Sequence, residues 1–113
     1  MHRHSHEDEC SFVIEGRIGA KLGEDVVEAG PGDYIFKPRG QWHTFWNAGD
    51  EPARFLEIIT PAGFEEYFAE LPKLFSGGMP DMTGLNVLAS RFGLEIDPMS
   101  IQPLVERFNL RMA

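Results

Sequence analysis

Short apolar runs, separated by glycine and proline turns, limit the possible folds of this chain more than any other feature. The runs contain many β-branched and aromatic residues, and each has the length of a single strand. Closely spaced strands with turn signals between them indicate an antiparallel sandwich or barrel. The predicted strands cover residues 11–16, 17–22, 25–28, 33–37, 43–46 and 54–60.

After residue 61 the apolar residues recur with a helical period instead. Phe64, Tyr67, Phe68 and Leu71 have this spacing, so a helix is predicted over residues 62–75, with Pro72 interrupting it or starting a second one. Further helices are predicted over 84–92, ending at the glycine in position 93, and over 100–108. The sequence therefore predicts an all-β unit over residues 1–62. A helical extension over 63–113 is expected to pack on it or on a partner subunit.

Alternating histidines stand at the start of the chain. Successive residues of a strand point to opposite faces, so His2, His4 and His6 are expected to share one face if this segment is extended. Neutral imidazoles, with a carboxylate nearby, suit divalent transition metals. The alternative is a histidine-rich segment exposed to solvent, and this segment alone does not decide between the two.

A second segment favours the metal site. Residues 32–47 fit the pattern G-x5-P-x-G-x2-H-x3-N at every fixed position, from Gly32 to Asn47, with His43 as its histidine. This segment resembles the second cupin motif. The start of the chain resembles the first cupin motif, H-x-H-x4-E-x6-G, through His2, His4, Glu9 and Gly16. Two patterns in the right order identify the chain as similar to small metal-binding cupins.

The resemblance implies a jelly-roll (cupin) barrel with one metal ion inside it. The implied ligands are His2, His4, Glu9 and His43, with His6 as an alternate. Three imidazoles and a carboxylate leave one or two coordination positions for water, oxygen or substrate. Copper is the first choice of metal because it stands highest in divalent affinity, and iron, manganese, nickel and zinc are the others considered.

Further candidates surround the histidine of the second motif. Trp42 and Trp46 either belong to the barrel core or form a stacking surface for a flat or cyclic substrate. Arg39 is a candidate for orienting that substrate, and its alternative is a solvated loop position.

Three residues are candidates for catalysis. Glu9 is a possible base as well as a ligand. The Tyr34 hydroxyl is a candidate for the surroundings of the metal. Gln41 is a polar group that is expected to orient a substrate, unless it lies in a solvated loop.

The first motif begins at residue 2, whereas most cupins have one or more strands before it. We therefore expect an uncovered sheet edge, a metal site near an open rim, and a homodimer that covers the edge. His2 is the least secure ligand, because chain ends fray.

The net charge of −8 makes a nucleic-acid or anionic-membrane partner unfavourable, since both need a basic surface. No segment reads as a secretory signal, and localisation stays open between a secreted protein whose signal was removed and a cytoplasmic one.

Three functions fit these features. The first is an oxidoreductase, with a compact copper cupin that cleaves a polysaccharide such as cellulose, using oxygen or peroxide, as the leading hypothesis. The second is a quercetinase-like dioxygenase acting on a small aromatic enediol. The third is a sugar-binding or structural cupin without enzymatic activity.

Overall fold

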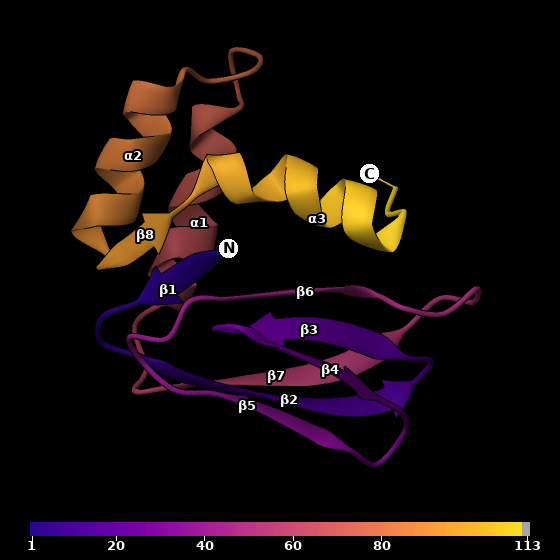
Figure 1. The fold of residues 1–113 in the computed structure, drawn as a ribbon. Helices are drawn as coiled ribbons and strands as arrows, with labels where there is room; N and C mark the ends of the chain where they lie inside the picture. Colours follow the sequence, from indigo (N-terminus) through magenta and orange to yellow (C-terminus); the bar gives the residue numbers. More distant parts are fainter. Residues whose placement is uncertain (112–113) are drawn as a thin grey trace.

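The computed structural model describes residues 1–111 as two facing antiparallel sheets with helices at one end (Figure 1). The elements are β1 (His2–His4), β2 (Asp8–Glu15), β3 (Ile18–Leu22), β4 (Asp25–Ala29), β5 (Tyr34–Lys37), β6 (His43–Asn47), β7 (Arg54–Thr60), α1 (Glu65–Leu74), α2 (Met82–Arg91), β8 (Leu94–Ile96) and α3 (Ile101–Phe108). The predicted jelly-roll barrel with a helical tail is confirmed.

The two sheets have the strand orders β4-β3-β6-β1-β8 and β5-β2-β7. Along each strand, successive side chains point alternately to the inner and the outer face of the sheet. In β2, for example, Ser11 and Val13 are buried while Ile14 is exposed. A first apolar core joins the sheets at one end of the barrel. It is built from Val13, Ile18, Ala20, Ala29 and Ile35.

A second apolar core lies between the other end of the barrel and the helices. Phe64, just before α1, and Tyr67 of α1 pack there with Leu88 of α2 and Leu94 of β8. The Asp81 carboxylate accepts a hydrogen bond from the Gly84 backbone N–H at 2.8 Å and so caps α2. The prediction that Pro72 interrupts the first helix is wrong. Pro72 lies inside α1, which continues through it to Leu74, so the proline neither ends this helix nor begins a second one.

Strand β8 was not predicted. It pairs with β1 along its whole length, with His2, Arg3 and His4 opposite Ile96, Glu95 and Leu94. The expectation that the edge of β1 is uncovered is therefore wrong, because the chain covers this edge with its own later residues. The segment after residue 62 thus contributes a strand to the larger sheet as well as helices.

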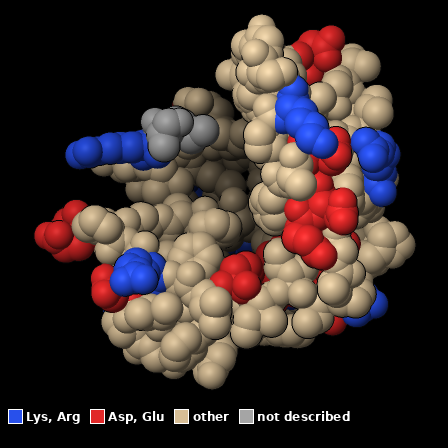
Figure 2. Space-filling model, turned by 180° about the vertical axis from the view of Figure 1, so that it is seen from behind, with Lys and Arg blue, Asp and Glu red and all other residues tan. Residues whose placement is uncertain are grey.

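Helix α3 lies along the outer face of the larger sheet. The Phe108 ring stacks on the indole of Trp46 with 4.5 Å between ring centroids. A groove of about 880 Å³ separates the rest of the helix from β6 and the loop after it, and Figure 2 shows this hollow from behind. Among the described residues, no helix combines the length and the apolar character that a membrane crossing requires.

Candidate metal centre

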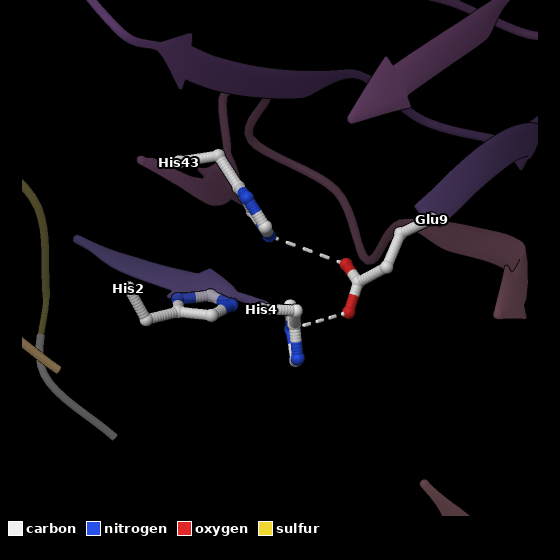
Figure 3. A group of neighbouring side chains, drawn as sticks. All are labelled: His2, His4, Glu9 and His43. Carbon is white, nitrogen blue, oxygen red and sulfur yellow. Dashed lines mark ion pairs between the residues drawn. The ribbon is translucent and has the colours of Figure 1, made fainter. Parts of the chain in front are cut away.

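Four side chains from three strands converge inside the barrel (Figure 3). His2 and His4 come from β1, Glu9 from β2 and His43 from β6. Each offers one ligand atom, and these atoms all lie within 4.8 Å of one another. These are the four residues that the two motifs predict as ligands.

The backbone pairing explains why these side chains meet. His2 lies opposite His43 in the antiparallel pair of β1 and β6, and His4 is two residues further along the same face. Glu9 approaches from the smaller sheet. The cluster therefore bridges the two sheets, next to the second apolar core, where the Phe64 ring meets the His4 ring at 4.6 Å between centroids.

The Glu9 carboxylate lies close to two of the three histidines. Its Oε1 lies 2.8 Å from Nε2 of His4, and its Oε2 lies 3.2 Å from Nε2 of His43. The His43 Nδ1 is 3.2 Å from the backbone carbonyl oxygen of Gln41. Because that carbonyl only accepts hydrogen bonds, it favours the tautomer with the proton on Nδ1. The Nε2 lone pair of His43 is then free for a metal.

The buried nitrogens supply a test of whether a metal fits. His4 is 2% exposed, His43 is 1% exposed and Glu9 is 7% exposed. Within residues 1–111, the Nε2 atoms of both histidines make no hydrogen bond of acceptable geometry, although they face Glu9. Buried polar atoms without partners are costly, and a cation between the imidazoles and the carboxylate satisfies them. The residues present therefore fit a divalent metal, and the cluster can bind one.

The ionisation states agree with this role. Burial lowers the pKa of His2 from 6.5 to about 3, with a smaller contribution from His43 and His4, so this imidazole is neutral at physiological pH. For Glu9, burial raises the pKa, but the imidazoles of His4 and His43 outweigh it and hold this pKa well below its ordinary range. The Glu9 carboxylate is therefore ionised at physiological pH, the state in which it can coordinate a metal.

The shifted pKa of His2 predicts an acid-sensitive apo protein. As the pH falls from 6.5 toward 3, unfolded chains protonate His2 while folded ones do not, so protons favour unfolding. We expect the melting temperature of the metal-free protein to fall between pH 7 and pH 4, and to fall less in His2→Asn. Circular dichroism melts at several pH values measure both slopes. Equal slopes in the two proteins would contradict the assignment to His2.

The other predicted site residues lie elsewhere. His6 is exposed in the turn after β1, outside the cluster, so the structure does not support it as an alternate ligand. Tyr34 lies on the outer face of β5, where its ring packs on Phe12 at 5.0 Å, and the prediction that it reaches the metal is wrong. Strand alternation is the reason, because Ile35 and Lys37 take the inner positions.

Both tryptophans also face away from the cluster. Trp46 lies across Gly19 under α3, and the Arg3 guanidinium stands 4.8 Å from the ring centre of Trp42. They occupy the opposite face of the larger sheet from His43, so neither lines a pocket beside the metal. Trp46 thus lies on the outside of the larger sheet against Phe108, so neither the predicted place in the barrel core nor the predicted stacking role at the metal matches the structure.

Arg39 and Gln41 lie on the loop that leads to His43. The Arg39 side chain and backbone N–H bind the Asp8 carboxylate, at 2.8 to 3.3 Å, and these hydrogen bonds lower the pKa of Asp8. Arg39 is thus engaged in fixing the loop to β2. Gln41 acts on the site through its backbone carbonyl. Its buried side-chain oxygen has no hydrogen-bond partner within residues 1–111.

Sequence reasoning missed a second polar group inside the barrel, formed by Ser11, Lys37 and Glu57. The two-residue period of the strands could have revealed this group, because Ser11 and Lys37 fall on the inward positions of β2 and β5.

The profile of the cupin domain family matches residues 1–59, more than half of the chain. The tetracenomycin polyketide synthase protein TcmJ of Streptomyces glaucescens is 32% identical over 60 residues, which are 53% of this chain and 40% of TcmJ.

Two crystal structures are similar as well. Protein BH2720 of Bacillus halodurans has a TM-score of 0.52 and 28% identity, covering 54% of this chain and 51% of its own. An uncharacterized conserved protein with a double-stranded β-helix domain, from Klebsiella pneumoniae, has a TM-score of 0.51 and 30% identity, covering 55% of both chains. The chain thus spans between 40% and 55% of the lengths of these relatives. From the family match, the two filled motifs and the barrel, the chain belongs to the cupin domain family.

Proposed function

We propose that this protein is a metal-dependent enzyme that acts on a small molecule with neighbouring oxygen atoms, such as an aromatic enediol or a related polyketide. The observation that carries the proposal is the buried donor set of His2, His4, Glu9 and His43 between the two sheets. A bound metal would supply Lewis-acid or redox chemistry there. The protein's own residues would orient a chelating substrate and exclude water.

The substrate class rests on chemistry and on one relative. Adjacent enol and keto oxygens are hard donors that suit the coordination positions left by four protein ligands. The relative TcmJ is described as a polyketide synthase protein, which agrees with a substrate of this kind.

The leading polysaccharide hypothesis is less well supported. It depended on an open metal site and on tryptophans beside it for a sugar chain. His4, Glu9 and His43 are instead buried, and Trp42 and Trp46 lie on the far face of the sheet. Buried ligands without an aromatic surface beside them suit a sugar chain poorly, so we favour the small-molecule substrate.

Copper remains our first choice of metal, on the general order of divalent affinities. Elemental analysis of protein purified without a histidine tag tests this choice. The metal-loaded protein is then incubated aerobically with quercetin, or separately with cello-oligosaccharides, and oxygen uptake and products are followed by mass spectrometry. We expect conversion of quercetin only. Oxidised oligosaccharides would support the polymer hypothesis, and failure of every divalent metal to bind would overturn the enzymatic proposal.

We also propose a homodimer, formed through the outer face of the smaller sheet. All outward side chains in its central part are uncharged: Cys10, Phe12, Ile14, Tyr34, Phe36, Leu56 and Ile58. The charged residues at its ends pair within the chain, Asp8 with Arg39 and Glu15 with Arg54. Two copies of this acidic protein can therefore approach here without burying an unpaired charge.

We expect Phe36→Lys to convert the dimer to a monomer, because two buried ammonium groups would face an apolar surface. Light scattering after size-exclusion chromatography measures the mass. Val87→Lys is the matched control, since Val87 on α2 is 58% exposed and Phe36 is 57% exposed. A monomeric wild type at micromolar concentration would contradict the proposal.

A further inference from the structure

A second cluster of polar side chains lies inside the barrel beside the metal-binding residues. The Lys37 ammonium donates hydrogen bonds to Ser11 Oγ at 2.7 Å and to Glu57 Oε1 at 2.5 Å, and the Ser11 hydroxyl donates to Glu57 Oε2 at 2.5 Å. The three residues come from the three strands of the smaller sheet. Lys37 is 1% exposed and is therefore among the most buried side chains of the protein.

A fully buried lysine needs an explanation. Lysine is almost never buried unless it is paired, because removing an ammonium group from water is costly. The neighbouring inward positions on the same strands, Val13 and Ile35, are aliphatic and belong to the first apolar core. An aliphatic residue at position 37 would extend that core without the desolvation cost. We therefore expect the positive charge of Lys37 to have a functional role inside the barrel.

The third partner of Lys37 indicates this use. Lys37 lies directly opposite Glu9 in the pairing of β2 and β5, and its Nζ is 3.4 Å from Oε2 of Glu9. The other oxygen, Oε1, faces His4. Lys37 thus contacts one oxygen of the carboxylate that belongs to the metal-binding cluster and leaves the other oxygen to the histidine side.

Metal binding would leave Lys37 as the donor to that oxygen. The His43 Nε2 that would bind a metal carries no proton, so His43 cannot donate a hydrogen bond to Oε2 of Glu9. The Lys37 ammonium can still do so. A carboxylate can bind a metal through one oxygen or through both, and a charge-assisted hydrogen bond to one oxygen weakens it as a ligand.

We propose that Lys37 is a positioning residue that holds one oxygen of Glu9 and restricts this carboxylate to a single metal–oxygen bond. The second oxygen would otherwise take a coordination position, and Lys37 keeps that position available for an external ligand. Glu57 and Ser11 fix the ammonium and balance its charge inside the barrel. This inference rests on the metal-dependent function proposed above and extends it to the control of an open coordination position.

The test uses Co(II) as a spectroscopic metal and azide as an external ligand. Lys37→Met alone leaves the carboxylates of Glu9 and Glu57 inside the barrel without their cation, so we expect it to be destabilised. The informative protein is Lys37→Met/Glu57→Gln, which removes both charges. It is compared with Glu57→Gln alone, so that only residue 37 differs. Lys21→Met, on β3 and outside both clusters, controls for the loss of a lysine.

In the double variant we expect Glu9 to chelate the metal through both oxygens. The visible absorption of the Co(II) form should weaken, as it does when the coordination number rises. Azide affinity should fall by roughly tenfold or more, the effect typical of losing a partner of a metal ligand. Lys21→Met should keep the wild-type spectrum and azide affinity.

Two results would overturn the inference in distinguishable ways. A folded double variant with the Co(II) spectrum and azide affinity of Glu57→Gln would show that Lys37 serves stability alone, while the metal-dependent function stands. A wild-type protein that binds neither Co(II) nor another divalent metal would remove the proposed function and the inference with it.

Discussion

Replacing His43 with glutamine is expected to lower metal affinity by more than about 100-fold, since even the loss of a residue that only supports a ligand costs 10- to 100-fold. His43 is 1% exposed, and its ring is oriented by the carbonyl oxygen of Gln41. Glutamine keeps most of the volume but has no imidazole nitrogen for the metal. Isothermal titration of the apo protein with Cu(II) or Zn(II) measures the change.

His6→Gln is the control, because His6 is exposed outside the cluster. We expect this variant to bind metal as the wild type does. A loss of affinity in His6→Gln without a loss in His43→Gln would mean that the N-terminal histidines bind metal outside the barrel. Circular dichroism at neutral pH checks that His43→Gln is folded.

Gly19→Val is expected to destabilise the protein by about 3 kcal/mol, the upper end of the range for overpacking in a core. A Cβ atom at Gly19 would overlap the indole of Trp46. Trp46 in turn stacks on Phe108, so a displaced indole also displaces α3 from the sheet. Urea denaturation followed by tryptophan fluorescence gives the free energy of unfolding.

Gly77→Val is the matched control, since nothing lies near its Cβ position in the loop before α2. We expect it to stay within about 0.5 kcal/mol of the wild type, as is usual for surface substitutions. Metal affinity of folded Gly19→Val should equal that of the wild type, because Trp46 lies on the far side of the sheet. An unchanged denaturation midpoint for Gly19→Val would contradict the packing of α3 on β3 and β6.

The cluster of four metal-binding candidates was predictable because its signal is local. Two short segments of the sequence carry the signal: one contains His2, His4 and Glu9, and the other is the loop that ends in His43. Strand alternation and one antiparallel pairing then bring the segments together. The jelly-roll class was predictable for a similar reason, since turn residues mark nearly every strand end.

The surroundings of the site were harder to predict because they depend on register. Trp46 is separated from His43 by three positions, an odd number, so the two side chains point to opposite faces of β6. The same parity places Tyr34 outside and Lys37 inside on β5. Strand β8 has three residues, and its pairing with β1 joins segments about ninety positions apart, which no local pattern indicates.

The position of β8 has a consequence for the order of folding. Strand β1 pairs with β6 only at His2 and takes the rest of its partners from β8, about ninety positions further along the chain. The strand that carries His2 and His4 is therefore fully paired only after the segment beyond β7 has folded onto the larger sheet. Assembly of the four-residue cluster is then coupled to the folding of the helical segment.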